Sequence, residues 1–260
     1  MQRILFPYPQ QFGFFPDIYE YVTLLRERGF EAFYIGIDQG NHHSNLPDFT
    51  RHLTADHVPM REFIRFVVQQ IADIKPDIVH SFHFRGSGTL PLLARKSAKK
   101  WVVDVRTIHV ETQNLKMTSD FWLRDRLTWL ETQSYDYVLA LTEKIHDKLR
   151  PSIRPVRIVP LGASYGKLNA GNKSLLREKT RYSLNLPMED PVILYAGSLS
   201  PTRQVDKLIK GFSLLLEHFP KAKLLLVGGE LGCDIVEDPL IRPLLRLSEE
   251  LSISSQVVFT

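Results

Sequence analysis

The chain has 260 residues, of which 43% are hydrophobic and 10% aromatic. That length and composition allow one large or two modest cores and exclude a disordered chain. The formal net charge is only +4 and is spread along the chain, which favours a solvated basic surface. It leaves a phosphate-bearing ligand or an anionic membrane surface open, and we expect no nucleic-acid partner.

Cys233 is the only cysteine, which excludes an intrachain disulfide framework and a cysteine metal cage and fits a reducing compartment. The first ten residues, MQRILFPYPQ, are too short and too interrupted by proline for a signal peptide. No apolar run approaches the length of a membrane span. We therefore expect a soluble, cytoplasmic protein.

Apolar runs alternate with helical periodicity through the first 160 or so residues. The predicted strands are Arg3–Pro7, 32–37, 77–82, 101–106, 135–141 and 156–160. The predicted helices are 18–25, 63–74, 90–98 and 121–133. This alternation predicts an α/β fold with a parallel sheet, and strands this uniformly apolar are expected when helices cover both faces. We assign 1–163 to a doubly wound, Rossmann-like domain.

A second alternation follows a segment rich in glycine, asparagine and serine. We assign 164–174 to a linker and 175–260 to a second domain. Its predicted strands are 192–196, 223–227 and 257–259, and its predicted helices are 205–219 and 241–251. This is half of a doubly wound domain, so we expect the second domain to be incomplete; a naturally small domain is the alternative.

The turn after the strand VILYA has the composition of a phosphate-binding turn. Gly197 allows close approach of the backbone to a ligand, and the next helix directs free N–H groups and its positive dipole end toward the same place. Arg203 adds a planar cation. A diphosphate suits such a site, although a plain strand-turn-helix with a surface arginine has the same spacing.

This stretch resembles the opening of the donor domain in family 4 glycosyltransferases. There a strand leads into Gly-Arg-Leu, then Lys-Gly and an apolar helix, then Pro-x-Ala and a strand ending in Val-Gly-x-Gly. Gly197 matches the first glycine and Arg203 the lysine. The other matching positions are Asp206, Leu208, Ile209, Pro220, Ala222 and Gly228.

Weaker resemblance extends upstream, in the same order, through PDIVHSFHF, YDYVLALTEKIHDKL and VRIVPLGAS. The resemblance implies a GT-B fold, in which two Rossmann-like domains face a cleft. It also implies retaining transfer of a sugar from a nucleoside diphosphate to an acceptor hydroxyl, in glycan, polysaccharide or glycolipid synthesis. It implies no metal and no cofactor besides the nucleotide-sugar donor.

The donor-side residues implied by the resemblance are Gly197, Ser198, Arg203 and Gly228. Ser198 stands where the family often has arginine and Gln204 where it usually has glycine, so phosphate binding would rest on Arg203 and the helix end. The family's later glutamate pair, which holds the donor ribose and sugar, has no counterpart; the adjacent Glu249 and Glu250 precede the last strand. We therefore expect a truncated donor domain.

The acceptor-side candidates are Gly13, His83, Arg106 and His109. Gly13 is what remains of the family's glycine pair. Arg106 and Thr107 stand at the positions of the family's His-Asp, and Arg106 can hold an anion but cannot act as a base. His80 and His83 point to opposite sides of their strand, which argues against a metal pair. The catalytic residue stays unknown, and for His83 and His109 a rim or surface histidine is the alternative.

Four cations, Arg95, Lys96, Lys99 and Lys100, come late in a predicted helix, where they suit the helix dipole; contact with a membrane surface, for a lipid-linked acceptor, is the alternative. Two functions besides an active transferase stay open. One is a catalytically silent acceptor-binding or scaffold protein that partners an active glycosyltransferase. The other is a nucleotide-sugar epimerase of the same architecture.

Overall fold

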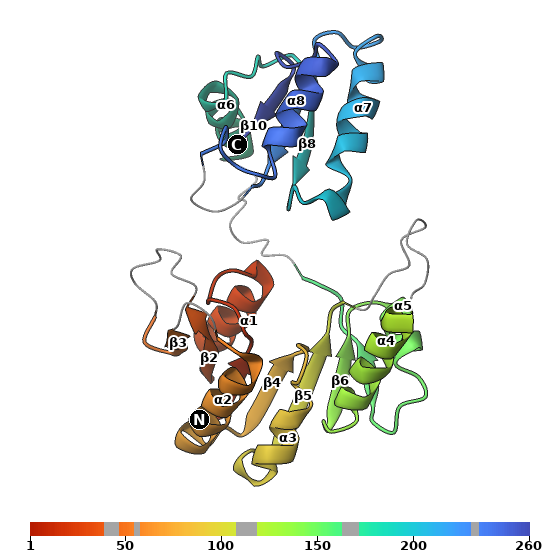
Figure 1. The fold of residues 1–260 in the computed structure, drawn as a ribbon. Helices are drawn as coiled ribbons and strands as arrows, with labels where there is room; N and C mark the ends of the chain where they lie inside the picture. The colour runs from red at the N-terminus through yellow and green to blue at the C-terminus, as the bar shows by residue number, and fades with distance from the viewer. Residues whose placement is uncertain (39–46, 55–57, 108–118, 163–171, 230–233) are drawn as a thin grey trace. The chain divides into compact units, whose positions relative to one another are not determined.

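A computed structural model describes residues 1–38, 47–54, 58–107, 119–162, 172–229 and 234–260. The chain divides into two compact units, Met1–Ser164 and Tyr165–Thr260, and each is described by itself (Figure 1). No helix in these ranges is both long and apolar enough to cross a membrane.

The first unit is built on a seven-stranded sheet in the order β3-β2-β1-β4-β5-β6-β7, with every neighbouring pair parallel. The strands are β1 (Arg3–Pro7), β2 (Glu31–Asp38), β3 (Thr50–Thr54), β4 (Ile78–Phe82), β5 (Lys100–Val105), β6 (Tyr137–Ala140) and β7 (Val156–Ile158). The helices are α1 (Pro16–Glu27), α2 (Met60–Ile74), α3 (Thr89–Ala94), α4 (Ser119–Thr132) and α5 (Glu143–Lys148).

Helices pack on both faces of this sheet because its strands are apolar on both sides. Along β1, Leu5 belongs to a core cluster that includes side chains of α2, α3 and α5. Its neighbours Ile4 and Phe6 belong to a second cluster, which they share with α1. Successive residues of a strand face opposite ways, so the two clusters lie on opposite faces. The predicted α/β, Rossmann-like fold is confirmed for this unit.

The second unit has a three-stranded parallel sheet in the order β10-β9-β8. Its strands are β8 (Val192–Ala196), β9 (Lys223–Val227) and β10 (Val257–Phe259); its helices are α6 (Lys173–Ser183), α7 (Val205–Leu215) and α8 (Arg242–Glu250), with a 3-10 turn, η4 (Pro201–Arg203). Helices α7 and α8 bury Ile209 and Leu244 in the same cluster as Leu224 and Leu226 of β9. The predicted α/β alternation is therefore present here too.

Three elements were not predicted from the sequence. β3 is a polar edge strand, α5 is short, and α6 begins inside the segment assigned to the linker and buries no side chain. In addition, the predicted helix over 90–98 ends as an α-helix at Ala94 and continues as a 3-10 turn, η1 (Arg95–Ser97). The three elements that were not predicted, β3, α5 and α6, lack the apolar periodicity on which the predictions depended.

Candidate functional site

The carboxyl ends of the parallel strands form one edge of the first sheet. The strand order reverses at β1, which lies between β2 and β4, and ligands of open α/β sheets bind beside such a reversal at the carboxyl ends. Gly13 follows β1, His83 follows β4 and Arg106 follows β5. The structure thus brings three of the four predicted acceptor-side residues to this edge. His109 lies outside the described residues.

Arg106 is held by two carboxylates. Its Nε and Nη2 donate to Oδ2 of Asp104 over 3.1 and 3.0 Å, and its guanidinium also pairs with Asp17 in the first turn of α1. The guanidinium carbon lies 4.4 Å from the ring centre of Phe82. Burial lowers the pKa of Arg106 to about 10, so it stays charged at neutral pH. This arginine ties β5 to α1; a contact with an acceptor stays a prediction.

Two buried titratable groups lie beside this arginine. Burial raises the pKa of Asp104 to about 7, against the opposing effect of the Arg106 guanidinium on the same carboxyl group. Burial lowers the pKa of His80 to about 4, and its ring centre lies 5.1 Å from that of Phe6. His80 Nε2 is 3.9 Å from Oδ2 of Asp104, too far for a hydrogen bond. His80 is therefore a neutral core histidine.

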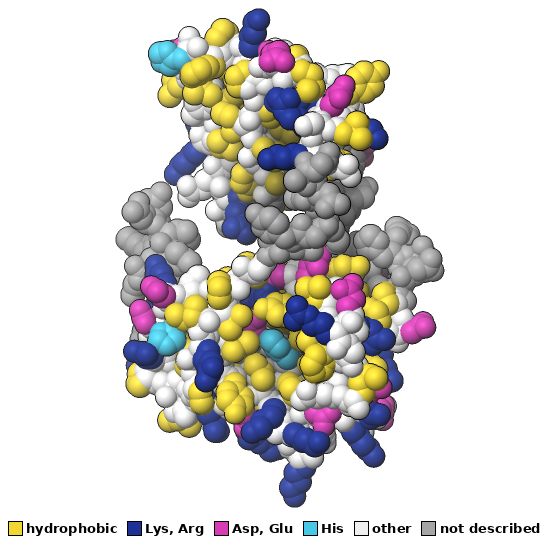
Figure 2. Space-filling view, turned by 180° about the vertical axis from the view of Figure 1, so that it is seen from behind, with side chains coloured by type: hydrophobic (Ala, Val, Ile, Leu, Met, Phe, Trp, Pro, Cys, Tyr) yellow, Lys and Arg dark blue, Asp and Glu magenta, His cyan; other side chains and the backbone are white. Residues whose placement is uncertain are grey.

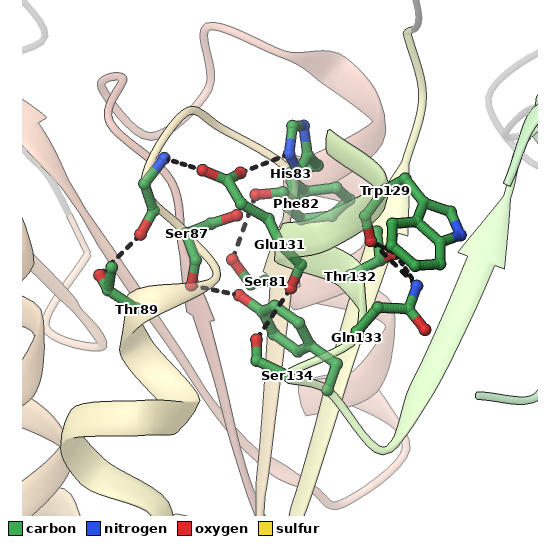
Figure 3. A network of polar contacts seen from close by, with 12 residues as sticks. Ser81, Phe82, His83, Ser87, Thr89, Trp129, Glu131, Thr132, Gln133 and Ser134 are labelled. Atoms are coloured by element: carbon green, nitrogen blue, oxygen red, sulfur yellow. Dashed lines mark hydrogen bonds and ion pairs between the residues drawn. The ribbon is translucent and has the colours of Figure 1, made fainter. Parts of the chain in front are cut away.

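His83 is joined to Glu131 near the end of α4 (Figure 3). His83 Nε2 lies 2.7 Å from Oε2 of Glu131, and the other carboxylate oxygen accepts from the Gly86 N–H, also over 2.7 Å. Close by, the Tyr135 hydroxyl donates to the Ser87 carbonyl over 2.7 Å. The loop that follows β4 is thus fastened to α4 and to the segment after it.

A polar cavity of about 300 Å³ opens beside this loop. It is lined by side chains from the loop, from the end of β5 and from α4: His83, Phe84, Arg85, Thr107, Arg124, Leu127, Thr128 and Glu131. Arg85 is exposed, and no hydrogen bond or ion pair engages it within the described parts of the chain. Guanidinium and hydroxyl groups together can hold a phosphate or carboxylate.

Gly13 lies in the turn between β1 and α1. Its φ is +93°, and a Cβ atom there would meet nothing within 4 Å. The backbone conformation therefore favours glycine, and the space beside it is open.

A second cavity of the first unit, larger than the one beside His83, has a volume of about 610 Å³ and lies against α1. Tyr21 and Leu24 line it together with Leu161 from the segment after β7.

In the second unit, the turns after β8 and β9 touch through their backbones. The Gly197 N–H donates to the Val227 carbonyl over 2.9 Å. A Cβ atom on Gly228, whose φ is +152°, would lie 2.0 Å from the Gly197 carbonyl oxygen. Gly228 is therefore required by the contact between these two turns, whereas an added Cβ on Gly197 would meet only the Tyr195 ring, at 3.5 Å or more.

The turn after β8 leads into a helix whose first N–H groups have no side-chain cap. Gln204 precedes α7 with φ at +55° and makes no capping hydrogen bond. Arg203 is exposed, and no ion pair or hydrogen bond to its side chain is found among the described residues. Ser198 is also exposed, and its Oγ accepts from the Ser200 N–H over 3.2 Å. A free guanidinium and an uncapped helix end therefore flank an exposed turn.

This strand-turn-helix unit lies inside a match to a known family. The sequence model of the family described as "Glycosyl transferases group 1" matches residues 177–260. The matched residues all lie within the second unit. The resemblance to family 4 glycosyltransferases is thereby confirmed.

Curated relatives of this chain include two proteins named D-inositol 3-phosphate glycosyltransferase. The protein from Mycobacterium bovis is 28% identical over 194 residues, which are 70% of this chain and 37% of that protein. The protein from Actinosynnema mirum is 28% identical over 171 residues, 60% of this chain and 39% of that protein. The matches thus span less than half the length of these relatives.

Solved structures resemble this chain over nearly all its length. Sucrose-phosphate synthase from Thermosynechococcus elongatus has a TM-score of 0.74 at 15% identity, and the match covers 100% of this chain and 70% of the synthase chain. HepE of Anabaena, solved with UDP and glucose, has a TM-score of 0.68 at 15% identity, covering 100% and 69%. UDP-GlcNAc 2-epimerase from Neisseria meningitidis has a TM-score of 0.61 at 14% identity, covering 99% and 72%. These likenesses support the GT-B fold.

The basic cluster of the first unit, Arg95, Lys96, Lys99 and Lys100, is partly neutralised. Arg95 pairs with Asp136, and Lys99 Nζ lies 2.7 Å from Oδ1 of Asp77. Figure 2 shows Lys and Arg side chains distributed around the first unit, with hydrophobic side chains between them. Two of the four cations, Arg95 and Lys99, thus have carboxylate partners.

Sequence reasoning missed Glu131, Arg85 and Arg124 as site residues. Glu131 lies 48 residues from His83 in the sequence, so no local sequence pattern predicts their contact. Arg85 and Arg124 come from a loop and a helix that meet only around the cavity. The glycines at 86 and 88 were the available signal, because glycine so close after a strand often marks a tightly held loop.

Proposed function

We propose that this protein transfers a sugar from a nucleoside diphosphate sugar to an acceptor hydroxyl, with retention, in carbohydrate synthesis. The observation that carries the proposal is the turn after β8, where exposed Gly197 and the free guanidinium of Arg203 flank the uncapped start of α7. Fixed donors and a cation of this kind bind a diphosphate and stabilise its charge as it leaves the sugar. No metal is needed for that role.

The acceptor belongs, in this proposal, at the carboxyl edge of the first sheet. The cavity that contains His83, Arg85 and Arg124 supplies a histidine, two guanidinium groups and threonine hydroxyls. Such a lining suits a carbohydrate or polyol that also bears a phosphate or carboxylate. The name of the curated relatives, D-inositol 3-phosphate glycosyltransferase, supports an acceptor of this class.

Calorimetric titration of the 260-residue chain with UDP- and GDP-sugars tests the donor site. We expect binding of at least one sugar nucleotide and a loss of roughly 10- to 100-fold in affinity in Arg203→Ala, because a charge-assisted hydrogen bond is removed. Lys221→Ala is the matched control, since this exposed lysine precedes β9 and lies at the opposite edge of the sheet. Equal losses in both variants would refute a specific role of Arg203.

The titration, together with an assay of product formation from the same sugar nucleotides, separates the other functions. A chain that binds no sugar nucleotide but retains acceptor binding is the silent acceptor-binding protein. A chain that converts UDP-GlcNAc without an acceptor is an epimerase, which is what the name of the Neisseria meningitidis structure describes. A transferase requires both substrates for turnover.

Cytoplasmic location and peripheral membrane contact are separate proposals. The first rests on the single cysteine, and the second on Lys96 and Lys100, to which no ion pair is assigned among the described residues. Binding to anionic vesicles that falls with salt and with neutralisation of these two lysines would support membrane contact. Binding that responds to neither would exclude this surface.

A further inference from the structure

Both carboxylate oxygens of Glu131 are used to hold the loop 83–88. One oxygen lies 2.7 Å from His83 Nε2, and the other accepts from the Gly86 N–H over the same distance. The loop also packs tightly here, since a Cβ atom on Gly88 would lie 2.7 Å from the Glu131 Cα. Figure 3 shows the Glu131 carboxylate facing His83. Glu131 is therefore the central tie between this loop and α4.

This contact determines the protonation pattern of the imidazole. An ionised carboxylate only accepts hydrogen bonds, so His83 Nε2 must carry the proton that faces Glu131. In a neutral ring, Nδ1 then has the free lone pair. Nδ1 makes no hydrogen bond within the described residues. The cationic members of the adjoining cavity, Arg85 and Arg124, can only donate hydrogen bonds.

We infer that Glu131 is a positioning residue that fixes the Nε2–H tautomer of His83 and thereby presents Nδ1 as a hydrogen-bond acceptor to a substrate hydroxyl. The cavity then takes a hydroxyl at His83 and an anionic group at the guanidinium side. No covalent step is involved. The hydroxyl contact rests on the proposed function, whereas the tautomer and the loop attachment do not.

Replacement of Glu131 by glutamine separates positioning from mere packing. In Glu131→Gln, the amide oxygen accepts from the Gly86 N–H, and the amide nitrogen, which only donates, faces His83. His83 Nε2 must then accept, so the proton moves to Nδ1. Size and loop contacts are retained, but the ring offers the substrate a donor in place of an acceptor.

Nitrogen-15 NMR of the histidine rings in the full chain tests this inference. We expect the His83 signal, assigned by its absence in His83→Gln, to show the Nε2–H form in the parent and the Nδ1–H form in Glu131→Gln. Ser134→Ala is the matched control, because within the described parts of the chain the Ser134 hydroxyl bonds only the backbone carbonyl of Glu131, and the tautomer should not change. An Nδ1–H parent, or an unchanged tautomer in Glu131→Gln, would overturn the inference.

Hydrogen exchange and a ligand probe complete the test. Exchange of the Gly86 amide should accelerate roughly 10-fold or more in Glu131→Ala, since a charge-assisted bond is lost; unchanged exchange would argue against the tie. Glucose 6-phosphate should shift the His83 Nδ1 signal in the parent, because Nδ1 then accepts a hydrogen bond from a sugar hydroxyl. An unmoved parent signal overturns the hydroxyl contact. A chain with the expected tautomer that binds no sugar nucleotide refutes only the proposed function.

Discussion

The guanidinium of Arg106 donates twice to a single oxygen of Asp104, over 3.1 and 3.0 Å. The side chains are only 17% and 4% exposed, so the pair is largely removed from water. Asp104 lies inside β5 and Arg106 directly after it, where the chain turns into the loop at the carboxyl edge. The pair therefore fixes how the backbone leaves the sheet at the proposed acceptor site.

Replacing Arg106 by methionine should destabilise the first unit by about 3 kcal/mol at pH 8, because Asp104 is left buried without its cation. The loss should be smaller at pH 5.5, where Asp104 can take up a proton. Urea unfolding of the parent and variant measures both values. Arg28→Met, which changes an exposed arginine of the same unit, should stay within about 0.5 kcal/mol of the parent.

The double variant Arg106→Met with Asp104→Asn checks the mechanism. Removal of the unpaired charge should recover part of the lost stability, since a neutral amide costs less to bury than a carboxylate. A double variant no more stable than Arg106→Met would show that the loss comes from packing over Phe82 and not from the charge.

Because of His80, the free energy of unfolding of the first unit should decrease as the pH falls below 6.5. The pKa of His80 is lowered from 6.5 to about 4 by burial, so the unfolded chain binds a proton between these values while the folded chain does not. Its contribution is thus complete above pH 6.5 and is lost as the pH falls toward 4, by roughly 1.4 kcal/mol per pH unit. In His80→Phe, which keeps an aromatic ring beside Phe6, the decline should be shallower. Thermal unfolding across pH 4 to 7 with identical slopes would contradict this.

Two glycines of the second unit should respond in opposite directions to alanine. Gly228→Ala should cost roughly 2–4 kcal/mol, because its Cβ would lie 2.0 Å from a backbone oxygen and the turns after β8 and β9 must separate. Gly211 lies within α7, and a Cβ there meets nothing within 4 Å. Gly211→Ala should stabilise the unit by about 0.5–1 kcal/mol. Urea unfolding that shows equal effects would contradict the contact argument.

Introducing an arginine at Ser198 should strengthen binding of a nucleoside diphosphate. Ser198 is exposed beside Gly197, and a second guanidinium near the helix end adds charge-assisted hydrogen bonds, which should tighten UDP binding roughly 3- to 10-fold at low salt. The gain should shrink as salt rises. Calorimetry in low and high salt measures it; weaker binding in Ser198→Arg would place the diphosphate elsewhere.

The sequence by itself determined the order and type of most helices and strands. Runs such as Arg3–Pro7 and the pattern of Phe63, Val67 and Ile71 predicted β1 and α2, because burial on a sheet or helix face imposes a local period. The glycine, the arginine and the apolar helix around Gly197 likewise predicted the family. These signals lie within short stretches of chain, where residue spacing alone is informative.

Other features required the tertiary structure. The sequence predicted β8 as a strand, but only the fold shows which of its side chains are exposed. Leu194 is 60% exposed, because β8 is an edge strand and the side chains of α7 and α8 pack with Ile193 and Tyr195 on the opposite face. The sequence predicted Arg106 and His83 as acceptor-side residues. Only the fold shows that Arg106 pairs with Asp17 and His83 with Glu131. Glu131 lies 48 residues from His83 in the sequence. The two residues meet because of the way the parallel strands and their helices pack, which the spacing of nearby residues does not predict.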